Sequence, residues 1–347
     1  MHVTAFYLPQ FHPIHENSEW WGAGFSEWTN VARARPLFPG HRQPVVPGEL
    51  GFYDLRNDET RADQAALAAS HGVSSFCYWH YWFGGRKILE KPLERVLESR
   101  SPNFPFVVSW ANESWRGTWY GAERSTLIEQ TYPGDDDHRA HFEYLEPFFH
   151  DDRYGRMLGR PMMFLYKPLA IPGFERFVEL WNSLAQKSGL GSMYWVGQVD
   201  SYADFGRIDR VLDQGYLNPA LGWKNYRNLD ARVFQLLRLP RMVDAELLSE
   251  GLAEALTRVT GAAPCVMPDW DNTPRAKRTG VVFRQSSGKT LAAQVKVARR
   301  HVEATREADE HLLVVKSWNE WAETNCLEPS LDRGREYLEA LRNALAD

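Results

Sequence analysis

The sequence has few of the features that define several large classes of protein. It contains three cysteines in 347 residues, Cys77, Cys265 and Cys326, which are too few and too scattered for a disulfide framework or a zinc knuckle. No apolar run approaches the roughly 18 residues that indicate a membrane-spanning helix. Residues 1–7 lack the basic segment, apolar core and small-residue cleavage site of a secretory signal. We therefore expect a cytoplasmic protein with no membrane span.

Neither the charge nor the motifs of the sequence indicate a protein that binds nucleic acid or nucleotides. The formal net charge is −5, so we expect no nucleic acid partner. No GxGxxG follows the first expected strand, and residues 286–290 lack the first glycine of a phosphate-binding loop. The motifs GxSxG and HExxH are absent as well. We expect no cofactor and no metal ion.

Short apolar segments alternate with longer amphipathic segments along the chain. The expected strands span residues 3–8, 73–80, 106–110, 161–166, 194–199, 210–214, 264–268 and 312–316. The expected helices span residues 60–71, 89–99, 137–149, 174–187, 244–260, 289–306 and 331–345. This alternation is typical of a parallel sheet with helical crossovers. Eight units favour an α/β fold in which residues 1–347 form a single (β/α)8 TIM barrel with long βα loops. An open doubly wound sheet is the alternative, because it has the same periodicity.

The sequence is rich in tryptophan, with 14 residues, and most of them follow expected strands or lie in the first long loop. These are Trp20, Trp21, Trp28, Trp79, Trp82, Trp110, Trp115, Trp119, Trp270, Trp318 and Trp321. In a barrel, the segments after the strands form the mouth of the active site. Aromatic rings at that place can stack on the apolar faces of sugars. We therefore favour a carbohydrate or another flat ligand over a core that merely uses tryptophan.

Two glutamates, Glu320 and Glu323, lie three residues apart in the segment SWNEWAE, directly after the eighth expected strand. If the segment turns helically, the two side chains share a face. Two close carboxylates beside apolar rings cannot both ionise easily, so the pKa of one of them should rise. The pair would then supply an acid and a base near neutral pH, as cleavage of a glycosidic bond requires. The alternative is a pair of surface glutamates at the start of a helix.

Polar and aromatic side chains after other strands are further candidates for binding sugar hydroxyl groups. Asp269 and Asp271 could ligate a hard cation, but the other ligands of a calcium loop are missing, so we expect hydroxyl recognition there. The expected substrate contacts are Tyr7, Trp28, Trp79, His80, Trp110, Asn112, Glu113, Asp269, Trp270, Asp271, Arg275, Trp318, Asn319 and Trp321.

Seven ordered motifs resemble those of the WbsX-type family, which is also described as glycoside hydrolase family 99-like. They are FYLPQFHPI, EWWGAGFSEWTNV, FYDLR, FCYWHYWFGG, SWANESW, DWDNTPR and SWNEWAETNCLEP, and they run from Phe6 to Pro329. The resemblance implies a (β/α)8 barrel that acts on an oligosaccharide or polysaccharide. Members are often associated with polysaccharide or O-antigen biosynthesis, and some are labelled glycosyltransferases.

The resemblance also implies roles for the two glutamates, because family 99 enzymes are retaining endo-α-mannosidases with a similar WNEWxE segment. By this motif, Glu320 would be the base that deprotonates the sugar 2-hydroxyl, which attacks the anomeric carbon and gives a 1,2-anhydro sugar. Glu323 would protonate the leaving oxygen and then activate water. One position departs from the family pattern, because Thr324 stands where members commonly have glycine.

Three functions are compatible with these observations. A retaining glycoside hydrolase on an α-linked mannose-like glycan is the interpretation that gives both glutamates a role. A glycosyltransferase for surface polysaccharide is the second; it would need a diphosphate site, for which the DxD formed by Asp269 and Asp271 is a formal match. A non-catalytic glycan-binding barrel is the third.

Overall fold

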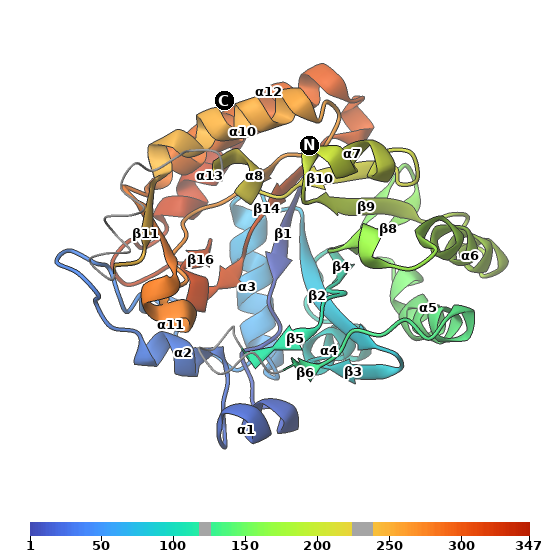
Figure 1. The fold of residues 1–347 in the computed structure, drawn as a ribbon, viewed down its shortest axis with the longest axis horizontal. Coiled ribbons are helices and arrows are strands. Elements are labelled where there is room, and N and C mark those ends of the chain that lie inside the picture. Colours follow the sequence, from blue (N-terminus) through green and yellow to red (C-terminus); the bar gives the residue numbers. More distant parts are fainter. Residues whose placement is uncertain (118–125, 224–238) are drawn as a thin grey trace.

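A barrel of parallel strands forms the centre of the molecule, and helices surround it (Figure 1). The structure is a computed structural model that describes residues 1–117, 126–223 and 239–347. The barrel strands are β1 (His2–Tyr7), β2 (Ser75–Phe83), β4 (Phe106–Trp110), β8 (Arg160–Leu165), β9 (Tyr194–Val199), β10 (Gln214–Leu217), β12 (Cys265–Val266) and β14 (Leu312–Val315).

The two ends of the sheet meet, which separates a barrel from an open doubly wound sheet. The hydrogen-bonded order is β10–β9–β8–β4–β2–β1–β14–β12. Tyr216 of β10 forms a parallel bridge with Ala263, two residues before β12. The amide of Leu217 donates to the carbonyl of Ala263 at 2.9 Å, and the amide of Ala263 donates to the carbonyl of Gly215 at 2.7 Å. The predicted (β/α)8 barrel is therefore confirmed.

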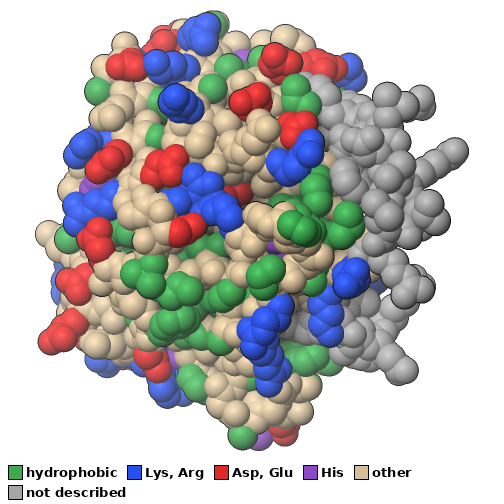
Figure 2. Space-filling view, turned by 90° about the vertical axis from the view of Figure 1, so that its left-hand side faces the viewer, with side chains coloured by type: hydrophobic (Ala, Val, Ile, Leu, Met, Phe, Trp, Pro, Cys, Tyr) green, Lys and Arg blue, Asp and Glu red, His purple; other side chains and the backbone are tan. Residues whose placement is uncertain are grey.

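The helices pack on the outer side of the barrel, as the amphipathic segments predicted. They are α3 (Asp58–Ser70), α4 (Lys91–Ser99), α5 (Asp135–Phe149), α6 (Phe174–Lys187), α7 (Tyr202–Ile208), α10 (Leu248–Arg258), α12 (Gly288–Thr305) and α13 (Glu336–Ala346). In the part of the chain that is described, no helix is long and apolar enough to cross a membrane. On the face seen in Figure 2, acidic and basic side chains are interspersed, which gives no extended field of one sign.

The sixth strand differs most from its prediction. It was expected at residues 210–214, but β10 begins where that range ends. Asp213 precedes β10 and is not part of it. Its carboxylate accepts the amide of Trp195 at 2.8 Å and pairs with Arg160 at 2.5 Å. Gly215 lies inside β10, where a Cβ would be 2.8 Å from a methyl of Val199. A short strand with a central glycine has little apolar signal in the sequence.

Several loops fold into small elements that the sequence pattern did not predict. The long first loop contains α1 (His15–Trp21) and α2 (Glu27–Arg33), so Trp20, Trp21 and Trp28 lie on short helices. The remaining short elements are β3 (Arg86–Ile88), β5 (Trp115–Arg116), β6 (Thr126–Ile128), β7 (Arg156–Met157), α8 (Ala220–Trp223), β11 (Arg241–Asp244), α11 (Thr273–Ala276), β13 (Val281–Arg284), β15 (Asn319–Glu320), the 3-10 turn η6 (Trp321–Glu323) and β16 (Asn325–Cys326). Helix α10 begins later than predicted because residue 244 ends the strand that pairs with β13 and residues 245–247 form a 3-10 turn.

Aromatic side chains fill the upper part of the barrel. The ring of Phe6 in β1 contacts Phe164 of β8 and Tyr216 of β10, which lie across the sheet order from it. Trp79 of β2 stacks on Phe6 with a centroid distance of 4.3 Å. This layer therefore forms a solid floor below the mouth of the barrel.

We predict that Phe6→Ala lowers the free energy of unfolding by about 3–5 kcal/mol, because it leaves a cavity in this floor. The exposed Phe52, 56% accessible, offers a matched control, and Phe52→Ala should cost less than about 1 kcal/mol. Urea denaturation of the three proteins measures both effects. Equal losses for the two variants would contradict the packing described for Phe6.

Candidate active site

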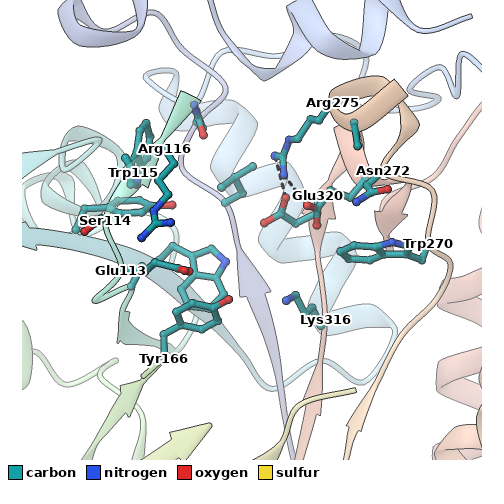
Figure 3. A pocket seen from close by; sticks show the side chains of 17 residues that line it. Glu113, Ser114, Trp115, Arg116, Tyr166, Trp270, Asn272, Arg275, Lys316 and Glu320 are labelled. Carbon is teal, nitrogen blue, oxygen red and sulfur yellow. Dashed lines mark hydrogen bonds and ion pairs between the residues drawn. The ribbon is translucent and has the colours of Figure 1, made fainter. Parts of the chain in front are cut away.

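A pocket of about 440 Å³ opens at the carboxyl ends of the barrel strands (Figure 3). Its lining comes from strand β2 and from the segments after β1, β4, β8, β12 and β14. The lining residues are Leu8, Gln10, Trp79, Tyr81, Ala111, Glu113, Ser114, Trp115, Arg116, Tyr166, Trp270, Asn272, Arg275, Ala276, Lys316, Glu320 and Glu323. This is the place where (β/α)8 barrels carry their active sites.

The two glutamates of the SWNEWAE segment share one cation. The guanidinium of Arg275 in α11 lies 2.7 Å from a carboxylate oxygen of Glu323 and 3.2 Å from one of Glu320. It also lies 2.9 Å from Glu27, the first residue of α2 and fully buried. One cation thus balances three carboxyl groups in a place with little access to water.

Burial and the neighbouring Glu323 carboxylate raise the pKa of Glu320 to about 7, although Arg275 acts in the opposite direction. Two interacting carboxyl groups titrate as a pair, so with this pKa the pair still retains a proton in part of the molecules near neutral pH. Such a pair offers both a proton donor and a proton acceptor. The rise that the sequence predicted for one member of the pair falls on Glu320.

The SWNEWAE segment is fixed by hydrogen bonds from nearby residues and from the end of β1. Ser317 accepts the amide of Glu320 at 3.0 Å and donates to the carbonyl of Asn325 at 2.7 Å. The amide side chain of Asn319 accepts from the backbone amide of Leu8 at 2.7 Å and donates to its carbonyl at 3.1 Å. Asn319 therefore joins the end of β1 to the SWNEWAE segment.

The aspartates of the DWDNTPR motif are held by the protein itself. Asp271 accepts hydrogen bonds at 2.7 Å from both His41 and Gln43, and Asp269 accepts one at 3.1 Å from Tyr337. Neither aspartate lines the pocket. Within the described ranges, no three His, Cys, Asp or Glu side chains are grouped closely enough to hold a metal ion.

Thr324, which stands where family members commonly have glycine, has a backbone conformation that favours glycine. Its φ is +53°, in the left-handed region where glycine is favoured and a β-branched residue is strained. Its hydroxyl accepts a hydrogen bond from Gln43 at 2.9 Å. The side chain thus adds a contact to the Asp271 cluster and keeps the turn that glycine would form more easily.

Aromatic rings form much of the pocket wall. Trp79, Trp270 and Arg275 are predicted substrate contacts that do line the pocket, as does Glu113, whose carboxylate lies 2.6 Å from Lys167. Trp115 meets Tyr81 edge-on with a centroid distance of 5.3 Å. Rings and charged groups therefore face one another across the space (Figure 3).

Three predicted contacts point instead into the layer between barrel and helices. The hydroxyl of Tyr7 donates to Gln64 of α3 at 2.6 Å. His80 and His141 of α5 are joined by a hydrogen bond of 2.9 Å between their Nε2 atoms. The ring of Trp110 lies against His141, and its indole nitrogen donates to a backbone carbonyl at 3.2 Å. These side chains stabilise the packing of the helices and do not line the pocket.

The other predicted contacts support the pocket from outside it. Trp28 and Trp321 pack against each other, and Trp318 is fully buried against Phe76. Asn112 donates to the carbonyl of Lys167 and accepts its amide, both at 2.8 Å. With Asn319, Asp269 and Asp271, these residues hold the strand ends in place. Trp119 lies outside the described residues.

Several residues at the pocket were not predicted from the sequence. Tyr81 stands inside an aromatic motif that was noted, whereas Tyr166 and Lys316 end expected apolar strands as single polar residues. Glu27, which pairs with Arg275 but does not line the pocket, stands inside another aromatic motif. The signal for Tyr166 and Lys316 was their position, because the last residue of a barrel strand lies at the mouth.

The chain matches the family described as glycosyltransferase WbsX over residues 3–341. The uncharacterized protein WxcX of Xanthomonas campestris pv. campestris is 33% identical over 349 residues, which cover 99% of this chain and 49% of WxcX. The chain therefore belongs to the WbsX family. It spans about half the length of the curated relatives that it matches.

Two solved structures are similar in fold across nearly the whole chain. A glycoside hydrolase-like protein has a TM-score of 0.63 at 14% identity, with 99% of this chain and 93% of that chain covered. The GH99 endo-alpha-mannosidase of Bacteroides thetaiotaomicron has a TM-score of 0.62 at 14% identity, with 99% and 96% covered. At this identity the likeness shows a shared barrel fold.

We predict that Thr324→Val destabilises the protein by about 1 kcal/mol, because it keeps the strained backbone and loses the hydroxyl. Thr324→Gly should stay within about 0.5 kcal/mol of the wild type, because relief of strain offsets the lost hydrogen bond. Chemical denaturation distinguishes the two. A larger loss for Thr324→Gly than for Thr324→Val would show that the left-handed turn is not strained by threonine.

Proposed function

We propose that this chain is a retaining glycoside hydrolase that acts on an α-linked, mannose-like glycan. The observation that carries the proposal is the carboxyl pair Glu320 and Glu323, held by Arg275 at the wall of an aromatic pocket. Membership of the WbsX family and the barrel shared with a GH99 endo-alpha-mannosidase support a glycan-processing enzyme. Trp79, Trp115 and Trp270 would stack on sugar rings, and Glu113 would bind hydroxyl groups.

In the proposed reaction, Glu320 removes the proton of the sugar 2-hydroxyl. The freed oxygen attacks the anomeric carbon, the glycosidic bond breaks, and Glu323 transfers its proton to the leaving oxygen. The product is a 1,2-anhydro sugar. Glu323 then takes a proton from water, the water oxygen opens the three-membered ring at the anomeric carbon, and Glu320 returns its proton to the 2-oxygen. Configuration is retained because two inversions occur.

Arg275 serves this cycle as a positioning residue. It contacts both carboxyl groups, so it holds the two side chains beside each other and favours their ionised forms. The raised pKa is that of Glu320 in the free pair, and the proposed reaction uses the arrangement with the proton on Glu323. The two arrangements contain the same number of protons, so pH does not distinguish them.

A glycosyltransferase is the second candidate, because the family is described by that activity. A transferase that uses a DxD motif binds a metal–diphosphate with it. Here Asp269 and Asp271 are engaged by Tyr337, His41 and Gln43 and lie outside the pocket lining. This arrangement favours the hydrolase.

We predict that Glu320→Gln and Glu323→Gln each lower kcat by about 10²–10⁴-fold, the range for a lost proton transfer. An aryl glycoside with a good leaving group should restore the first step in Glu323→Gln, because its leaving oxygen needs no proton. It should not restore Glu320→Gln, which lacks the base for the 2-hydroxyl. Release of the phenol, followed by stopped flow, measures this step.

Exposed Glu98 supplies the matched control, since Glu98→Gln changes the same group away from the pocket and should keep full activity. A 2-fluoro substrate should remain intact because its internal nucleophile is missing. A covalent 2-fluoroglycosyl adduct on either glutamate, detected by mass spectrometry, would replace the anhydro-sugar route with a glycosyl-enzyme. Full activity of both Gln variants would refute the site.

We predict that kcat/KM of the wild type falls above an apparent pKa of about 7. The reaction needs the singly protonated pair, and the pKa of Glu320 near 7 marks the loss of its last proton. In Glu323→Gln with the aryl glycoside, the pH dependence of kcat/KM should have the opposite sign. The first step then needs only ionised Glu320, whose pKa falls once the Glu323 charge is gone, so the rate should rise with pH and level off below pH 7. A pH profile that is identical in the two proteins would contradict the coupling.

A further inference from the structure

Two basic side chains face the pocket and are not used by the proposed reaction. Lys316 directly follows β14, and the register of β1 and β14, Ala5 opposite Val315, places Lys316 next to Phe6. Phe6 points into the barrel, so the side chain of Lys316 lies beside the same layer of aromatic rings. Arg116 of β5 reaches the pocket from the opposite wall (Figure 3).

The acidic side chains of the pocket already have cationic partners. Glu113 is paired with Lys167, and Glu320 and Glu323 are paired with Arg275. Across residues 1–117, 126–223 and 239–347, no carboxylate oxygen lies within 4.0 Å of a nitrogen of Lys316 or Arg116. Lys316 is close enough to Glu320 to favour its ionised form, but it does not form an ion pair with it.

The lining contributes three acidic and three basic side chains, so its formal charges balance, but Lys316 and Arg116 are the two cations that no described carboxylate pairs with. Lys316 is half-buried beside Phe6, so part of its side chain is removed from water. A neutral sugar would remove more water from both cations and supply only hydroxyl oxygens, which is unfavourable for charged groups. A negatively charged group on the sugar would form charge-assisted hydrogen bonds with them.

We propose that the pocket selects a glycan whose sugar carries an anionic substituent, a carboxylate or a phosphate ester, bound by Lys316 from the floor and Arg116 from the wall. The proposal rests on the proposed function and specifies its substrate class. Both substituents present oxygens with negative charge, and both cations recognise that chemistry. Arg116 can bind two of the oxygens at once, whereas Lys316 acts as a point charge.

The test compares three ligands that differ only at the sugar 6-position. Methyl 1-thio-α-mannoside, its 6-carboxylate and its 6-phosphate resist hydrolysis, so calorimetry on the wild-type protein measures affinity alone. At least one of the anionic ligands should bind about tenfold or more tightly than the neutral ligand, and the advantage should shrink as salt is raised. The tighter of the two identifies the substituent. Equal affinities, or no binding by any of the three, would overturn the proposal.

Variants separate charge recognition from general sugar binding. Lys316→Met and Arg116→Met should each reduce the preference for the anionic ligand by about threefold or more, while Lys316→Arg should keep it. The controls Lys187→Met in α6 and Arg207→Met in α7 change the same residue types outside the pocket and should have no effect. If Lys316→Met weakens neutral and anionic ligands equally, Lys316 binds hydroxyl groups and the proposal fails. That result leaves the roles of Glu320 and Glu323 intact, because those rest on turnover.

Discussion

The ion pairs of Arg275 with Glu27, Glu320 and Glu323 are the interaction on which the site depends. A buried carboxylate is costly without a partner, and here one guanidinium serves three. The net charge of these four side chains approaches zero only when carboxyl groups among them are protonated. Burial first, and then the neighbouring Glu323 carboxylate, raise the pKa of Glu320, and catalysis would use the proton that Glu320 retains.

Polar side chains that follow the strands divide into two groups with different tasks. One group, Asn112, Asn319, Asp269 and Asp271, bonds to the backbone or to neighbouring side chains and fixes the strand ends. The other group, Glu113, Arg275, Lys316, Glu320 and Glu323, faces the pocket. Behind the pocket, Glu328 accepts hydrogen bonds from Tyr53, Gln64 and Trp321 at 2.5–2.7 Å, and its burial raises its pKa to about 7. The rigid frame makes it possible to hold several charges at fixed separations.

The sequence predicted the barrel well because apolar periodicity and strand order are local properties of the chain. The strands at residues 106–110 and 194–199 were predicted with their correct limits, whereas β10 was displaced because Gly215 and Asp213 weaken its pattern. The pocket position of the glutamate pair followed from its place after the last strand.

The direction of a side chain was not predictable in the same way. His80 stands between Trp79 and Tyr81 in β2, and Trp110 ends β4, but alternation turns His80 and Trp110 toward the helices. Glu27 could not be linked to Arg275 from sequence, because 248 residues separate them.

The bond between Leu8 and Asn319 has a consequence for how the protein is made. The two residues are 311 positions apart, and β1 finds its neighbour β14 only at the same late point. A ribosome adds about 5–20 residues per second, so one edge of β1 stays unpaired for on the order of tens of seconds during synthesis. Exposed strand edges attract other strands during that interval. Closure of the barrel and docking of the SWNEWAE segment therefore occur together, late in synthesis, and a ribosome-bound intermediate that lacks β14 has neither.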